Sequence, residues 1–296
     1  MIRAISVGET AILSSVRGVR GSVTKVFREA AYIWFGDDMI VVTRGGAVSP
    51  VSIVLEMKIP LCDAVHPGDK CTARGEYLDL GSLSIWTGGA RRYRTGRESE
   101  DVRLPGDECL IRSAAALRML YDVSEGSRIF LESCEFLRFS RWLVNAATRG
   151  GSLYSLERYA DVIGLGAGFT PAGDDMLSGF LATFNRAARS HGWRQIGIPF
   201  DFASARTSRE SAALLNYSQR GVLDERTEGQ LKYLLSGNEE GYVHELLASA
   251  PRGHTSGLDT SLGILLCAAV LAERERRSGI ARRVLGTLTA RQKQFK

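Results

Sequence analysis

The residues best suited to chemistry lie in one glycine-rich segment, residues 164–175, which reads GLGAGFTPAGDD. Glycine can adopt a positive φ, and it lets backbone N–H groups approach a ligand closely. Thr170 and Pro171 are typical of a helix start, so a helix is predicted to begin at Thr170 or a few residues later. Its free N–H groups and dipole would form an anion site. The candidate substrate-binding residues of this segment are Gly166, Gly168, Thr170 and Gly173.

Two adjacent carboxylates, Asp174 and Asp175, fall in the first turn of this predicted helix. They would repel a bound anion unless a cation lay between them. A Mg²⁺ ion held by one or two carboxylates, ligand oxygens and water would resolve that conflict, so both residues are candidate Mg²⁺ ligands as well as candidate catalytic residues. Two alternatives stay open: the carboxylates would grip an amide or ammonium group directly, or they would only complement the helix dipole at an exposed cap.

A second segment, residues 253–259 (GHTSGLD), leads into another apolar helix and repeats the spacing of the first. In each segment a threonine stands two residues after a glycine, and an aspartate stands six residues after it. Capping requires one hydroxyl group, but it does not require the same spacing twice. We therefore predict that the two helix starts face each other across one pocket. The second segment contributes His254 and Asp259 as candidate catalytic residues, and Thr255, Ser256 and Gly257 as candidate substrate-binding residues.

Other motifs carry weaker signals. His254 would donate to an oxyanion or act as an acid or base near neutral pH, and a structural histidine is the alternative. Residues 207–211 (TSRES) resemble a helix N-cap, beside which Arg206 and Arg209 would reach a carboxylate. The sequence has no Gly-x-Ser-x-Gly elbow, no Walker A loop and no dinucleotide-binding fingerprint before a helix.

Composition limits the class of protein and its partners. The 296 residues are 44% hydrophobic and 24% charged, with a net charge of +5, which is typical of a globular chain. A basic stripe with interleaved aromatic residues is missing, so no nucleic-acid partner is expected. The five cysteines are widely spaced without a Cys-x-x-Cys pair, which suits a reducing compartment. The start of the sequence lacks a signal-peptide pattern, and the apolar residues 262–272 are too short to span a bilayer, so we expect a cytoplasmic protein without a membrane partner.

The periodicity of hydrophobic residues predicts an α+β fold in two parts. Short runs rich in Val, Ile and aromatic residues, separated by glycine, predict an antiparallel β-rich, barrel-like domain over residues 1–105. Apolar residues at three-to-four spacing then predict a mostly α-helical domain over residues 106–296. The strands are expected at residues 23–27, 31–35, 39–42, 51–55, 69–73, 76–80 and 83–86. The helices are expected at residues 107–121, 129–147, 153–163, 176–188, 208–218, 228–235, 242–247 and 260–276.

At its two glycine–threonine–aspartate segments the sequence resembles the AllH-like family, whose members include a subunit of a multi-protein oxamate carbamoyltransferase of anaerobic allantoin degradation. The family pattern resembles Gly-x-Gly-Pro-Gly-Leu-Thr-Pro-Ser-Gly-Asp-Asp, followed about 80 residues later by Gly-His-x-Ser-Gly-x-Asp. Here Ala167, Phe169 and Ala172 replace the proline, leucine and serine of that pattern. These departures leave the glycines of the turn in place.

The resemblance implies carbamoyl transfer from carbamoyl phosphate to an acceptor such as oxamate, within purine and allantoin catabolism. It implies that Asp174, Asp175 and Asp259 orient an amide group or bind Mg²⁺, and that His254 stabilises developing negative charge. It also implies partner subunits, and a homo-oligomer is a further alternative. Two other functions stay open at this point: a non-catalytic subunit for ligand binding or assembly, and an enzyme of Mg²⁺-dependent phosphoryl transfer.

Overall fold

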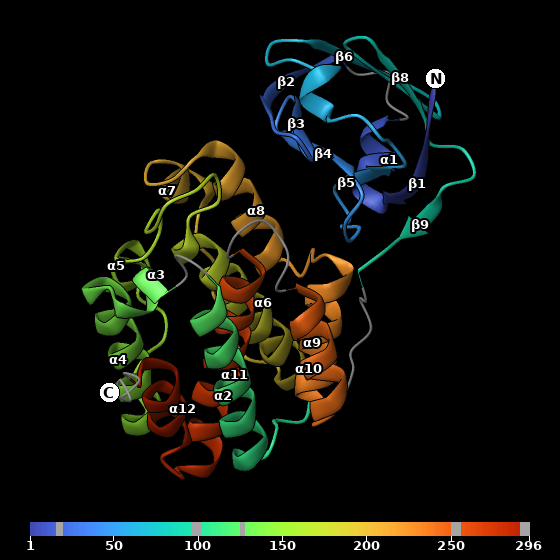
Figure 1. Ribbon diagram of the computed structural model, residues 1–296. Helices are drawn as coiled ribbons and strands as arrows, with labels where there is room; N and C mark the ends of the chain where they lie inside the picture. The colour runs from blue at the N-terminus through green and yellow to red at the C-terminus, as the bar shows by residue number, and fades with distance from the viewer. Residues whose placement is uncertain (16–19, 96–101, 125–127, 250–255, 291–296) are drawn as a thin grey trace, which may run out of the picture. The chain divides into compact units, whose positions relative to one another are not determined.

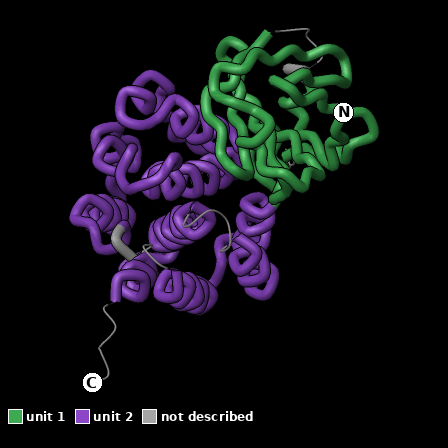
Figure 2. Tube along the Cα trace, turned by 45° about the horizontal axis from the view of Figure 1, so that its top comes forward, with its two compact units in different colours: residues 1–96, 222–225 green, residues 97–221, 226–296 purple. Residues whose placement is uncertain are grey.

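A computed structural model describes residues 1–15, 20–95, 102–124, 128–249 and 256–290. The chain divides into two compact units, which Figure 2 shows in different colours. The first unit comprises residues 1–96 and 222–225, and the second comprises residues 97–221 and 226–296. Residues 222–225 are held in the first unit by hydrogen bonds: the Leu223 carbonyl accepts from the Tyr93 hydroxyl at 3.1 Å, and Glu225 pairs with Arg91 at 2.7 Å.

In the described residues of the first unit, eight strands close into a barrel (Figure 1). Their order is β5-β4-β3-β2-β6-β7-β8-β1, and β1 pairs again with β5, while β9 adds beside β1. The bounds are β1 Ile2–Gly8, β2 Arg20–Val26, β3 Ala30–Phe35, β4 Asp38–Arg44, β5 Ser52–Leu55, β6 Lys70–Arg74, β7 Tyr77–Leu80, β8 Leu83–Trp86 and β9 Arg91–Tyr93. A helix, α1 (Glu9–Ser15), and a 3₁₀ turn (Leu61–Asp63) complete the unit.

The barrel and the helices that follow it confirm the predicted α+β layout. Alternate side chains of the strands fill the barrel interior, as in Cys71, Ala73, Leu78 and Leu80 of the β6–β7 hairpin, all at most 1% exposed. Three pairings are parallel rather than antiparallel as predicted: β4 with β5, and β1 with both β8 and β9. Strands β4 and β5 are neighbours in sequence, but a loop returns the chain so that both run the same way.

The second unit is helical. Its described helices are α2 Asp107–Val123, α3 Arg128–Glu132, α4 Cys134–Arg149, α5 Leu156–Ala160, α6 Ala172–His191, α7 Phe200–Ser204, α8 Arg209–Gln219, α9 Glu225–Leu235, α10 Glu239–Ser249, α11 Ser256–Arg276 and α12 Ile280–Thr289. The single helix predicted over residues 129–147 is two helices, α3 and α4. The break occurs because the Ser133 hydroxyl accepts the Phe136 N–H and starts a new helix.

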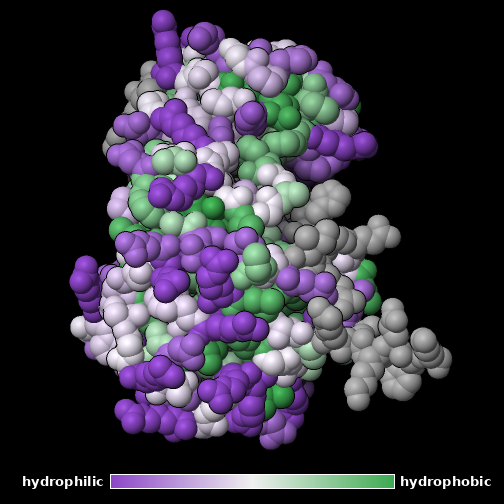
Figure 3. Space-filling view, turned by 90° about the vertical axis from the view of Figure 1, so that its left-hand side faces the viewer, coloured by the Kyte–Doolittle hydropathy of each residue, from purple (hydrophilic) through white to green (hydrophobic). Residues whose placement is uncertain are grey.

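Helix α11 forms the centre of this unit and packs against α2, α4, α6, α10 and α12. By length and composition α11 could cross a membrane, but 83% of its apolar window is buried inside the protein, as expected of a core helix. This confirms the buried helix predicted around residues 262–272. On the face shown in Figure 3, hydrophobic residues gather in patches bordered by hydrophilic side chains.

The packing of α6 against α11 is unusually close, because glycines lie at the crossing. A Cβ atom on Gly179 would lie 2.0 Å from the Thr260 carbonyl oxygen, and one on Gly263 would lie 1.8 Å from the Met176 carbonyl oxygen. No side chain larger than hydrogen fits at such distances. The backbones of the two helices are therefore in direct contact, about two turns after each helix begins.

Candidate functional site

The glycine-rich loop before α6 has the conformation that its sequence predicts. Gly164, Gly166 and Gly168 have φ values of 77°, 108° and 111°, and a Cβ atom on Gly164 would lie 2.2 Å from the Arg206 carbonyl oxygen. Gly166 and Gly168 are exposed, and Thr170 is half-buried. Helix α6 begins at Ala172, with Pro171 at its N-cap, within the range predicted for its start. The loop thus leads from an exposed turn to the buried first turn of the helix. Its backbone is accessible in the exposed part.

Asp174, in the first turn of α6, fixes the conformation of this loop through hydrogen bonds. It is 2% exposed, and its Oδ1 atom accepts the Gly164 N–H at 2.8 Å. Its Oδ2 atom accepts the Ser211 hydroxyl at 2.7 Å and also the Thr207 hydroxyl. These bonds close the loop onto the start of α6 and join it to the start of α8. Asp174 therefore holds the backbone of the site in place.

The predicted N-cap at residues 207–211 is confirmed. Ser208 caps α8, and its hydroxyl accepts the Ser211 N–H at 3.1 Å. The guanidinium of Arg206 is exposed and lies 3.9 Å from the ring centre of Phe202. Sequence reasoning recognised the cap but missed that two hydroxyls beside it, those of Thr207 and Ser211, bind Asp174. No local sequence pattern indicates these contacts, because Thr207 and Ser211 stand 33 and 37 residues after Asp174.

Asp175, the next residue, lies beside Asp259 of α11. Asp175 is 8% exposed and Asp259 is fully buried. Burial raises the pKa of Asp175 well above its ordinary value, and the negative charge of Asp259 raises it further, although hydrogen bonds from the Ser256 and Thr170 hydroxyls act in the opposite direction. The Asp175 Oδ2 atom is buried and has no hydrogen-bond partner among the described residues. The starts of α6 and α11 thus meet at a pair of buried carboxyl groups.

A buried tyrosine forms a hydrogen bond with one member of the carboxyl pair. The Tyr121 hydroxyl donates to Asp259 Oδ1 at 2.6 Å, and the tyrosine side chain is fully buried. Burial and the neighbouring charge of Asp259 raise the pKa of Tyr121 well above its ordinary value, so the hydroxyl keeps its proton. A hydrogen bond from Tyr121 favours the ionised form of Asp259. The raised pKa of Asp175 means that this carboxyl group binds a proton more readily than an exposed aspartate does. Tyr121, on α2, was not predicted from the sequence.

The helix crossing explains why Asp175 and not Asp174 faces Asp259. Asp175 stands four residues before Gly179, and Asp259 stands four residues before Gly263. Contact between the backbones at the two glycines therefore brings the carboxyl groups one turn earlier into proximity. The spacing noted in the sequence paired Asp174 with Asp259, but the helix packing pairs Asp175 with it.

The remaining predicted residues have different surroundings. Gly173 and Gly257 are buried near the starts of α6 and α11, where a Cβ atom would lie 1.9 Å from the Val162 carbonyl oxygen and 2.3 Å from the Ser249 carbonyl oxygen, respectively. Their role in the fold is close packing. Ser256 is half-buried at the first position of α11. Gly253, His254 and Thr255 lie outside the described residues.

The carboxylate of Asp174, a predicted Mg²⁺ ligand, is engaged within the fold. Both carboxylate oxygens of Asp174 accept hydrogen bonds. Among the described residues, no group of three or more His, Cys, Asp or Glu side chains is placed to hold a metal ion. The Mg²⁺ site at Asp174 and Asp175 therefore stays a prediction.

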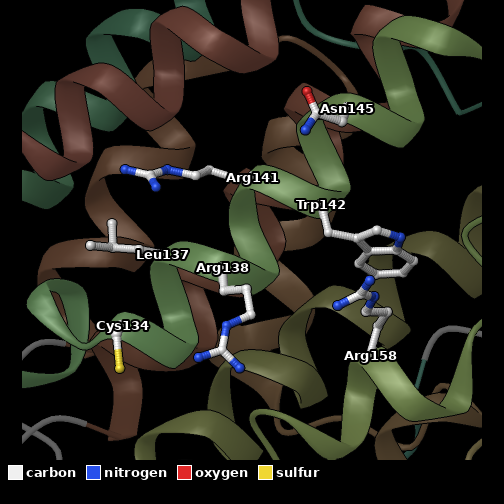
Figure 4. Close-up of a pocket in the computed structure, with 7 residues that line it drawn as sticks. All are labelled: Cys134, Leu137, Arg138, Arg141, Trp142, Asn145 and Arg158. Carbon is white, nitrogen blue, oxygen red and sulfur yellow. The ribbon is translucent and has the colours of Figure 1, made fainter.

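Two cavities in the helical unit lie away from the carboxyl pair. One, of about 860 Å³, is lined by residues of α6 and α11 and of the loops before α2 and α5. The other, of about 510 Å³, lies on the outer side of α4 (Figure 4). Figure 4 shows the guanidinium of Arg158 against Trp142, while Arg138 and Arg141 point away from each other. Neither cavity is lined by a residue predicted for the site.

Comparison with known families places the carboxyl pair inside a matched region. The family model described as oxamate carbamoyltransferase subunit AllH matches residues 162–268. That stretch contains the glycine-rich loop, both helix starts and the crossing of α6 with α11. The match confirms the resemblance to the AllH-like family that the two segments predicted. Comparisons with curated proteins and with solved structures gave no match.

Proposed function

We propose that the chain is a subunit of a carbamoyltransferase-type enzyme, and that a small anion such as carbamoyl phosphate or an oxamate-like acceptor binds where α6 and α11 begin. The observation that carries this proposal is the buried pair Asp175–Asp259, with an Asp175 oxygen that lacks a partner among the described residues. The match to the oxamate carbamoyltransferase subunit covers both helix starts and supports the same reaction class.

In this proposal, the anion is bound by groups of the glycine-rich loop and of the two helix starts. Exposed backbone at Gly166 and Gly168 would supply N–H donors to the oxygens of the anion. The half-buried hydroxyls of Thr170 and Ser256, which contact Asp175, would supply two more polar groups. Asp174, which is occupied by hydrogen bonds within the fold, is a positioning residue in this scheme. His254 and Thr255 stay predictions from the sequence.

The chemistry of carbamoyl transfer requires a proton acceptor. A nitrogen of the acceptor attacks the carbonyl carbon of carbamoyl phosphate, the bond from that carbon to the phosphate oxygen breaks, and the attacking nitrogen loses a proton. Two neighbouring carboxyl groups share one proton more readily than they both ionise, so the pair holds an acid and a base at once. In our proposal the proton enters at Asp175, which is 8% exposed whereas Asp259 is fully buried, while the proton of Asp175 passes to Asp259.

Ligand-induced stabilisation of the purified chain tests the binding half of the proposal. Carbamoyl phosphate and oxamate are each added at constant ionic strength, with sodium chloride as the blank, and the unfolding temperature is measured. A ligand at 100 times its Kd stabilises the native state by about 2.7 kcal/mol. We expect stabilisation of the unmodified chain and its loss in Asp175→Asn.

The matched control is Asp201→Asn, which removes an exposed first-turn aspartate of another helix, α7. It should respond to the ligands like the unmodified chain. Ligand stabilisation that persists in Asp175→Asn would show that the carboxyl pair is not the binding site. Turnover is assayed with the candidate partner subunits present, as release of phosphate from carbamoyl phosphate that depends on oxamate. Binding without such turnover would identify a non-catalytic ligand-binding subunit instead.

A further inference from the structure

The larger cavity of the helical unit combines aromatic rings with several arginine side chains. It has a volume of about 860 Å³, within the range of small-molecule sites. Three aromatic side chains line it, from separate parts of the chain: Tyr154 before α5, Phe184 within α6, and Trp193 after α6. Three arginines line it as well: Arg103, Arg194 and Arg274.

The aromatic side chains of the cavity differ in their exposure to solvent. Phe184 is buried, and Tyr154 meets its ring edge-on with ring centres 6.0 Å apart. Trp193 is 46% exposed and stacks on His191 with ring centres 4.6 Å apart, so the lining of the cavity includes a large, partly exposed planar group. An exposed tryptophan beside a cavity offers a planar group the ring face that it needs for stacking.

The charge of the cavity favours an anion. Arg194 lies over the Tyr154 ring at 5.2 Å, and the Arg274 guanidinium donates to the Gly151 carbonyl oxygen at 3.0 Å. Neither these two nor Arg103 forms an ion pair with an acid among the described residues. Among the described residues that line the cavity, Glu275 is the one acid, against three arginines and His191. Arginine binds phosphate and carboxylate groups through two parallel hydrogen bonds, so the excess is suited to such groups.

We propose that this cavity binds a nucleotide, with its base stacked on Trp193 and its phosphates on Arg274 and neighbouring arginines. The site is separate from the carboxyl pair: Arg274 follows Asp259 by 15 residues in α11, about 22 Å along the helix at 1.5 Å per residue. The proposal therefore does not rest on the carbamoyltransferase function, and it adds a second ligand class to the same unit.

Isothermal titration and tryptophan fluorescence test this with AMP, ADP and ATP as probes, and with adenosine and inorganic pyrophosphate as half-ligands. We expect the nucleotides to bind and to quench Trp193, and each half-ligand to bind at least tenfold more weakly, because it lacks either the charge or the ring. Trp193→Leu and Arg274→Gln should each weaken nucleotide binding roughly tenfold or more.

Two controls keep the test specific. Arg138→Gln removes the same charge from the outer side of α4, outside this cavity, and should leave nucleotide affinity unchanged. Asp175→Asn should also leave it unchanged, which separates this site from the carboxyl pair. The proposal is overturned if nucleotides do not bind, if pyrophosphate binds as tightly as ADP, or if Arg274→Gln and Arg138→Gln lower the affinity equally.

Discussion

The crossing of α6 and α11 at Gly179 and Gly263 gives the sharpest test of the site geometry. Replacing either glycine with alanine would put a methyl group 2.0 Å from the Thr260 carbonyl oxygen or 1.8 Å from the Met176 carbonyl oxygen. Ordinary contact begins near 3.4 Å, so relief requires a local shift of about 1.4 Å at Gly179 and about 1.6 Å at Gly263. Both obstacles are helix backbone, which cannot move aside as a flexible side chain does. The helices must therefore separate.

The magnitude follows from two opposing effects. Overpacking a well-packed core costs about 1–3 kcal/mol, and a clash with backbone belongs at the upper end of that range. Alanine is a better helix former than glycine by about 1 kcal/mol, which offsets part of the cost. We expect Gly179→Ala and Gly263→Ala each to lower the free energy of unfolding by about 2 kcal/mol. In a unit of this size, that lowers the unfolding temperature by roughly 4–8 °C.

Thermal unfolding followed by circular dichroism at 222 nm measures this difference. Gly286→Ala is the matched control, because Gly286 is exposed within α12 and a Cβ atom there meets nothing within 4 Å. It should raise stability by about 0.5–1 kcal/mol. If Gly179→Ala and Gly263→Ala raised stability as Gly286→Ala does, the close crossing would be wrong, and with it the juxtaposition of Asp175 and Asp259.

Three further predictions address the carboxyl groups and the core. The folded-state pKa of Asp175 is raised above its unfolded value of about 3.9, so the stability it contributes is fully present below that pH and is lost as pH rises through the folded-state pKa. Asp175→Asn removes this loss, so its unfolding free energy should gain on that of the unmodified chain between pH 4 and pH 8; a difference independent of pH, measured by urea titration, would contradict the raised pKa. Ser211→Ala removes a buried hydrogen bond of 2.7 Å to the Asp174 carboxylate and should cost about 1.5–3 kcal/mol in the same assay, whereas Ser218→Ala, which loses a bond to its own helix at Leu214, should cost less than about 1 kcal/mol. Equal losses in the two serine variants would argue against the role of Asp174 in fixing the loop. In the native protein a thiol reagent should modify the exposed Cys62 and Cys134 within minutes, while the buried Cys71 and Cys267 react only after unfolding; burial raises the pKa of Cys71 to about 12, and rapid reaction of all five thiols would show that the two cores are not packed as described.

The fold class could be predicted from the sequence because the sequence patterns that indicate it are local. Glycine turns between short β-rich runs predicted the barrel, and apolar spacing predicted most helices of the second unit. Closure of the barrel through parallel pairing of β1 with β8 was not predictable, because it depends on contacts between residues about 80 positions apart. The return of residues 222–225 to the first unit left no signal in composition.

The candidate site was predictable in part, again for a physical reason. The glycine–threonine–aspartate segments mark helix starts, and the sequence correctly indicated that the starts of α6 and α11 meet. Which aspartates face each other is decided by the glycines one turn later, Gly179 and Gly263, whose role appears only when the helices are packed. Tyr121 comes from α2, far from both segments in sequence, so no local pattern links it to Asp259.

The energetics of the carboxyl pair bear on the proposed function. Burying a carboxyl group costs free energy, and placing a second one beside it adds repulsion, which is why the pKa of Asp175 rises. A purely structural helix start is satisfied by an exposed cap, or by a fully bonded acid such as Asp174. Asp175 instead keeps an oxygen without a partner among the described residues, beside hydroxyls from both helices. The proposed function gives this destabilising arrangement a role, because a bound ligand or a transferred proton would offset its cost.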